Sequence, residues 1–111
     1  MYGSRHIYCG INQVVASLPR ITDLGIGVEV LFDDTRDLWP QVRWENLLNI
    51  ADALADEGID ATVHGPFHGL NMGTADQHIR DYSLAVLTGA LEAARAFRSP
   101  LMVFHTGFLP Q

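Results

Sequence analysis

Short apolar runs of strand length recur four times along the chain. The runs at residues 26–32 and 101–104 are apolar almost throughout, which is typical of strands buried inside a parallel sheet. Two further runs, at residues 5–9 and 59–63, are rich in β-branched or aromatic residues and are expected to form strands as well. The pattern therefore predicts four strands.

Two segments between these runs carry helix signals with marked ends. The first covers about residues 18–24, with Pro19 expected in the first turn, where its missing N–H has no partner to lose. Gly25 is expected to end this helix in the left-handed conformation. The second helix begins at Trp44, has apolar residues at helical spacing and is expected to end at Gly58.

The longest periodic segment lies between the third and fourth predicted strands. It opens with Thr74-Ala75-Asp76-Gln77, the spacing of a capping box, in which the Thr hydroxyl and the Gln amide bind backbone N–H groups reciprocally. Apolar residues then hold one helix face as far as Phe97, and Ser99-Pro100 breaks the pattern. A third and longer helix is predicted here.

The order of these elements is strand, helix, strand, helix, strand, helix, strand. Such alternation predicts an α/β fold with a parallel sheet and right-handed crossovers. An open doubly wound sheet and part of a (β/α)8 barrel both have this order. The chain contains neither Gly-x-Gly-x-x-Gly after the first strand nor a P-loop, which weighs against a nucleotide-binding fold.

The composition is that of a folded and acidic globular protein. Of 111 residues, 48% are hydrophobic and 18% are charged, which suits one small domain over residues 1–111. The 7 basic residues are all Arg and face 13 acidic ones, so the net charge of −6 disfavours a nucleic-acid partner. The single cysteine, Cys9, is expected to be a buried thiol in a reducing compartment. No signal peptide or membrane span is visible, so we expect a cytoplasmic protein without a membrane partner.

Histidines mark the ends of two predicted strands. Parallel α/β proteins gather their sites at the carboxyl ends of the strands, and His64 and His105 directly follow the third and fourth runs. A neutral imidazole binds zinc, manganese or iron, and it also acts as an acid or base near neutral pH. Together, these two residues are predicted to be functional, whereas His6 and His78 are expected to be structural.

Four more residues near these strand ends are candidates for the same site. Glu29 lies inside an apolar run, where an unpaired carboxylate is costly, so it is expected either to belong to a strand-end site or to pair with an Arg. Phe67 and His68 lie in the loop after the third strand, where Phe67 can stack on a sugar and His68 can reach the cleft. Asn71 is expected to form either loop hydrogen bonds or a substrate contact.

Two motifs give the chain a family resemblance. The segments are Val63-His64-Gly65-Pro66-Phe67 with Leu70-Asn71, and Val103-Phe104-His105-Thr106-Gly107 after a long Ala-rich helix. With this spacing the chain resembles the N-terminal half of the xylose isomerase-like TIM barrels, which include sugar (phosphate) isomerases and epimerases and the endonuclease IV type of abasic-site nuclease. One departure is Thr106, where that superfamily commonly has Pro.

The resemblance implies a metal-dependent enzyme. We expect a sugar or sugar-phosphate isomerase or epimerase that moves a proton next to a carbonyl, with an abasic-site endonuclease as the alternative. His64 and His105 match zinc ligands of the nuclease branch, whereas in the isomerase branch the residue matching His64 faces the sugar. Glu29 is expected to orient one histidine or a substrate hydroxyl. Zinc, manganese, cobalt and magnesium are all candidate metals.

The length implies only part of such a barrel. A complete (β/α)8 barrel needs roughly 250 residues, so 111 residues hold the first four strands and three helices. We therefore expect the remaining metal ligands to lie outside this chain and the chain alone to be inactive. Its unpaired sheet edges favour association with a second copy or with a missing second half, so a non-catalytic half-barrel that only associates is a third alternative.

Overall fold

The computed structural model describes residues 5–33, 35–105 and 107. Four strands form one sheet in the order β1-β2-β3-β4, and each neighbouring pair is parallel. Their bounds are β1 (His6–Gly10), β2 (Gly27–Leu31), β3 (Ala61–His64) and β4 (Met102–Val103). All four predicted strands are confirmed, although β3 begins later and β4 is shorter than the apolar pattern indicates.

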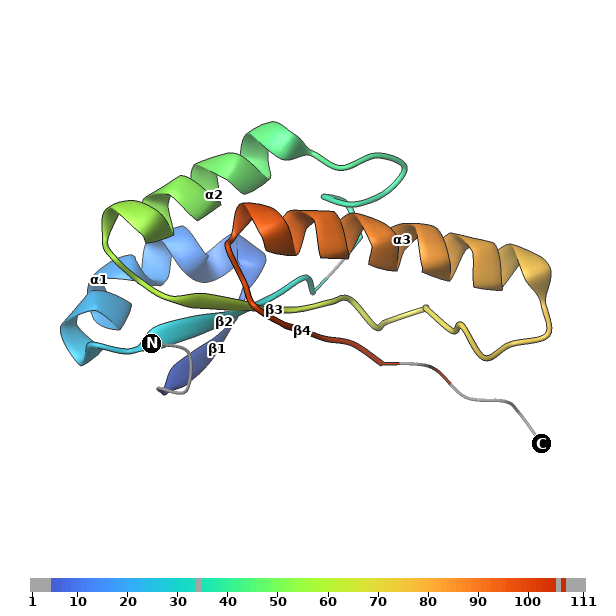
Figure 1. Ribbon diagram of the computed structural model, residues 1–111, viewed down its shortest axis with the longest axis horizontal. Coiled ribbons are helices and arrows are strands. Elements are labelled where there is room, and N and C mark those ends of the chain that lie inside the picture. Colours follow the sequence, from blue (N-terminus) through green and yellow to red (C-terminus); the bar gives the residue numbers. More distant parts are fainter. Residues whose placement is uncertain (1–4, 34, 106, 108–111) are drawn as a thin grey trace.

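Helices connect the strands and lie on one side of the sheet. They are a short 3-10 helix (Ile11–Gln13), α1 (Val14–Leu24), α2 (Trp44–Asp56) and α3 (Gln77–Ala96). Figure 1 shows all three α-helices above the sheet, with no helix of the described residues on its other side. Among the described residues, no helix is long and apolar enough to cross a membrane.

The core lies between the helices and the covered face of the sheet. Val28, Val30 and Val63 of the central strands are fully buried, and Leu47 of α2 and Val86 of α3 pack over them. Cys9 is buried beside this core with a free thiol, as its expected apolar role requires. Because successive strand residues face opposite sides, the residues between these valines face the uncovered side.

Helix α1 begins earlier than the sequence pattern indicates. The expected start near residue 18 is wrong, since the helix starts at Val14 and holds Pro19 in its interior. Proline cannot donate to the carbonyl four residues before it, which is that of Val15. Both residues are exposed, so water can bind the carbonyl that Pro19 leaves without a partner. Gly25 ends the helix at φ +64°, as predicted.

The start of α3 also differs from the expected capping box. The N-cap is Asp76, whose carboxylate accepts hydrogen bonds from the backbone N–H groups of His78 (2.9 Å) and Ile79 (3.3 Å). Thr74, the expected cap, instead accepts from the N–H of Asp76 at 3.1 Å. A charged carboxylate at the positive end of a helix is a stronger cap than a hydroxyl, which explains why Asp76 takes the position.

Candidate strand-end site

The uncovered face of the sheet carries a row of polar side chains at its carboxyl-terminal end. Tyr8, Glu29 and Thr62 are paired across β1, β2 and β3, so they share this face. His64 pairs with Leu31 one step further along and shares the same face. This face therefore brings two of the predicted site residues, Glu29 and His64, onto neighbouring strands.

Glu29 and His64 form a hydrogen-bonded pair. Glu29 Oε2 lies 2.9 Å from His64 Nδ1, and the side chains are 28% and 13% exposed. A carboxylate only accepts hydrogen bonds, so Nδ1 carries a proton, and Nε2 has a lone pair when the ring is neutral. Of the two alternatives for Glu29, the structure therefore shows a partner at the strand end.

The second nitrogen of His64 has no hydrogen-bond partner among the described residues. Nε2 is buried and, within the described part of the chain, makes no hydrogen bond. A buried polar atom without a partner is costly, and such atoms mark places where a ligand, an ion or water binds. The ring of His105 lies 5.4 Å from that of His64, at an angle of 34°. The two histidines predicted at equivalent strand ends are therefore neighbours in space.

Phe67 lies at the centre of the histidine group. Its ring centroid is 4.3 Å from that of His68, 4.8 Å from that of His105 and 5.8 Å from that of His64. The ring thus fixes the relative positions of the three imidazoles and offers an apolar surface beside them. His68 is exposed, and its ring contacts that of Phe67.

Asn71 has a structural place in the loop after β3. Its side-chain Oδ1 accepts from the N–H of Gly73 at 2.9 Å, and its own N–H donates to Oγ of the fully buried Ser83 at 2.8 Å. These contacts tie the loop to α3. Of the two expected roles, the loop hydrogen bonds are present, and a substrate contact by Asn71 stays a prediction.

The donor set suits a divalent metal but does not complete a site. An imidazole whose Nδ1–H is held by a carboxylate is the usual form of a metal-binding histidine, with Nε2 as the ligand. His64 fits this form, and His105 is close enough to join it. Among the described residues, however, no group of three or more His, Cys, Asp or Glu side chains is placed to hold an ion. Further ligands would have to come from elsewhere.

Tyr8 and Asp33 also lie at this site, although no motif in the sequence marks either residue. The Tyr8 ring meets that of His64 edge-on, with centroids 5.7 Å apart and planes at 84°. Partial burial raises the pKa of the Tyr8 phenol above 10.0, and the negative charges of Glu29 and Asp33 raise it further. The alternation of β1 places Tyr8 on the same face as Gly10, but the position of Asp33 depends on the loop after β2, which no motif marks.

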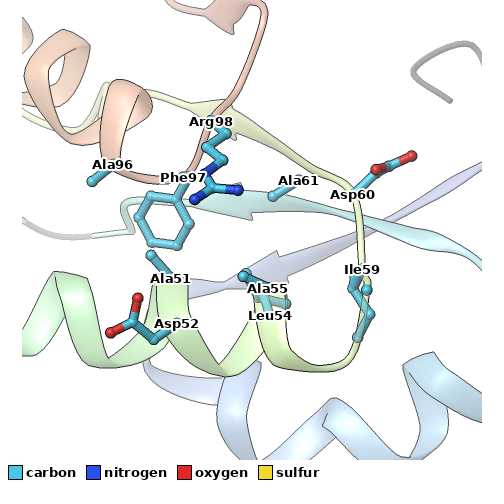
Figure 2. Close-up of a pocket in the computed structure, with 11 residues that line it drawn as sticks. Ala51, Asp52, Leu54, Ala55, Ile59, Asp60, Ala61, Ala96, Phe97 and Arg98 are labelled. Carbon is cyan, nitrogen blue, oxygen red and sulfur yellow. The ribbon is translucent and has the colours of Figure 1, made fainter.

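A separate hollow lies at the opposite end of the strands. It has a volume of about 250 Å³ and is lined by the ends of α2 and α3 and the start of β3, including Leu54, Asp60, Ala61 and Phe97 (Figure 2). Sites of parallel α/β proteins form at the carboxyl ends of the strands, whereas this hollow lies at their amino ends. It is therefore not part of the site that contains His64.

Comparison with known proteins identifies the family. The model of the xylose isomerase-like TIM barrel family matches residues 21–111, which include α2, β3, α3 and β4. The chain belongs to this family. Its four parallel strands, in sequential order and with helices on one face, are the first half of such a (β/α)8 barrel.

A solved structure extends the comparison to nearly the whole chain. The TTHB071 protein from Thermus thermophilus, in a crystal soaked with ZnCl2, superposes with a TM-score of 0.75 and 25% sequence identity. The match covers 93% of this chain and 39% of that protein, so the chain spans well under two thirds of its length. No curated protein matches the chain. Thr106, the departure from the family motif, lies outside the described residues.

Proposed function

We propose that this chain forms the first half of a divalent-metal-dependent sugar or sugar-phosphate isomerase or epimerase. The observation that carries the proposal is the state of His64, whose Nδ1 is held by Glu29 at 2.9 Å while Nε2 is buried without a hydrogen-bond partner among the described residues. A nitrogen prepared in this way either binds a metal or accepts a proton from a substrate.

The residues of this chain would perform three tasks in such a reaction. Glu29 holds the His64 ring in one orientation through Nδ1, which leaves Nε2 for the metal or the substrate. His105 lies beside it and would bind the same ion, and the Phe67 ring packs against that of His105. A bound divalent ion would polarise the substrate oxygens and stabilise the negative charge that develops next to the carbonyl.

The distribution of charge favours the isomerase over an abasic-site nuclease. A nuclease would use His64 and His105 as zinc ligands, but it must also hold a phosphate backbone. The carboxylates of Glu29 and Asp33 lie near enough to the Tyr8 phenol to raise its pKa, so this end of the sheet is negative. A sugar that carries at most one phosphate group fits this surface better than the phosphate chain of DNA does.

The proposal includes a complementary half. Within the described residues, β1 and β4 each pair with one neighbour only, and Ile7, Val103 and Phe104 at these edges are more than two fifths exposed. Unpaired edges with exposed apolar side chains favour pairing with further strands. We propose that such strands complete both the barrel and the metal site, and that the chain alone does not turn over substrate.

Solvent exchange tests the proposed reaction. The completed barrel containing this chain is incubated with aldoses and ketoses in D2O, with and without Mn²⁺, and deuterium at the carbon next to the carbonyl is measured by NMR. We expect metal-dependent incorporation that His64→Ala abolishes and that His78→Ala, a change at an exposed helix position, leaves intact. Incorporation that survives His64→Ala would overturn the proposal, as would cleavage of abasic-site DNA without any exchange.

A further inference from the structure

Beside the histidines, the open face holds a phenol and a carboxylate that the proposed chemistry does not use. Tyr8 is paired in register with Glu29, and its side chain is 52% exposed. Asp33 follows β2 at the same end of the sheet and is exposed. Neither group has a role in the proton transfer proposed at His64.

Gly10 places the Asp33 carboxylate over the end of β1. A Cβ at Gly10 would lie 2.7 Å from Asp33 Oδ2, closer than real Cβ contacts come, and 3.4 Å from its Cγ. Gly10 lies two residues after Tyr8, so the side chain that it lacks would project from the same open face. Because Gly10 has no side chain, the Asp33 carboxylate can occupy the space above the end of β1.

We propose that Tyr8 and Asp33 bind a pair of neighbouring hydroxyl groups of the substrate, with the phenol O–H of Tyr8 as donor and the carboxylate of Asp33 as acceptor. This inference rests on the proposed function and names the part of the sugar that the chain recognises. Each substrate hydroxyl can accept one hydrogen bond and donate another, so a phenol and a carboxylate on one face satisfy a diol.

The Tyr8 hydroxyl is held at a defined place beside His64. The Tyr8 ring is fixed edge-on against His64, so its hydroxyl has a defined position relative to the Glu29–His64 pair. The phenol O–H can donate one hydrogen bond, and the carboxylate of Asp33 only accepts. A diol bound here would hold the rest of the sugar over His64, where the proton transfer is proposed to take place.

An NMR titration of the chain with xylitol tests the inference. Xylitol carries neighbouring hydroxyls but no carbonyl, and pentane-1,5-diol, which has no neighbouring hydroxyls, is the control ligand. We expect saturable shifts of the backbone amides of Tyr8 and Asp33 with xylitol only. Shifts confined to other parts of the chain, or equal shifts with both ligands, would overturn the inference.

Variants connect the binding to the named atoms. Asp33→Ala and Gly10→Ala should each weaken xylitol binding about tenfold, because one removes the carboxylate and the other displaces it. The double variant should lose no more than either single one, since the two changes act on the same contact. This non-additivity would not follow from a general loss of structure, and unchanged binding in Asp33→Ala would contradict the inference.

The phenol hydroxyl is tested by a change that keeps the ring. Tyr8→Phe should weaken xylitol binding by roughly three- to tenfold while the His64 ring protons keep their chemical shifts. Tyr82→Phe is the matched control, because the Tyr82 hydroxyl bonds Thr35 at 3.1 Å on the helical side. Asp56→Ala, at the exposed end of α2, is the control for the carboxylate.

A zinc titration of the completed barrel that contains this chain separates this inference from the proposed function. If Zn²⁺ shifts the His64 and His105 rings but Tyr8 and Asp33 variants bind xylitol normally, the diol site is wrong and the proposed function stands. If xylitol binding depends on Tyr8 and Asp33 but Zn²⁺ leaves His64 unaffected, the metal-dependent function is wrong and the diol site stands. If neither ligand binds, both fail.

Discussion

Removing the Glu29 carboxylate should weaken metal binding at His64 without unfolding the chain. In Glu29→Ala, the 2.9 Å hydrogen bond to Nδ1 is lost, so the ring is free to rotate and to exchange its proton between the two nitrogens. Carboxylates that hold a metal-binding histidine are typically worth 10- to 100-fold in affinity, which corresponds to about 1.4–2.7 kcal/mol.

The position of the pair sets where in this range the effect should fall. His64 is 13% exposed and Glu29 is 28% exposed, so water can only partly replace the carboxylate. We therefore expect a loss of at least about tenfold. Glu29→Gln should lie between Glu29→Ala and the unchanged chain, because an amide oxygen still accepts from Nδ1 but carries no charge.

Isothermal titration of the completed barrel with Zn²⁺ measures the effect. Glu57→Ala, at an exposed position after α2, is the matched control and should bind Zn²⁺ as the unchanged chain does. Thermal unfolding of each variant, followed by circular dichroism, shows whether the fold is kept. Equal Zn²⁺ affinity in Glu29→Ala and in the unchanged chain would refute the reasoning, since the pair would then have no bearing on the free nitrogen of His64.

Three further predictions concern the rest of the chain. Asp76→Ala removes two hydrogen bonds at the start of α3 and should cost about 1 kcal/mol of unfolding free energy in urea denaturation, whereas no measurable loss would contradict its role as the cap. Ser83→Ala leaves the N–H of Asn71 without its buried acceptor and should cost about 1–3 kcal/mol, with faster amide exchange at Asn71; unchanged exchange would contradict this contact. Because folding raises the pKa of the Tyr8 phenol, the free energy of unfolding should fall as pH rises from 10.0 through the folded-state pKa. Glu29→Gln should lower the pKa of Tyr8 in a tyrosinate absorbance titration, and an unchanged pKa would mean that Glu29 has no charge effect on Tyr8.

The strands and most of the helices could be predicted because each is marked by residues within its own segment. Apolar runs mark the strands, helical spacing marks α2 and α3, and Gly25 and Gly58 both adopt the positive φ that their positions after helices require. The start of α1 could not be predicted in this way. Pro19 is favoured in a first turn but is tolerated later where the carbonyl it leaves unpaired is exposed to water, and exposure depends on the tertiary fold.

The site was predictable where it depends on topology alone. His64 and His105 follow neighbouring parallel strands, so their proximity follows from the order of the elements. The pairing of Glu29 with His64 also depends on the strand register. Glu29 lies opposite Thr62, which is two residues before His64 in β3. The contact between Asp33 and Gly10 depends on a loop path that no spacing in the sequence determines.

The state of the His64 ring tests the central claim most directly. Nitrogen-15 NMR of the histidine side chains distinguishes a protonated nitrogen from a free one, and it detects which nitrogen binds Zn²⁺. The account predicts that His64 carries its proton on Nδ1, held by Glu29, and that Zn²⁺ shifts the Nε2 signal while Nδ1 stays protonated. A proton on Nε2, or an Nε2 signal that Zn²⁺ leaves unchanged, would contradict it.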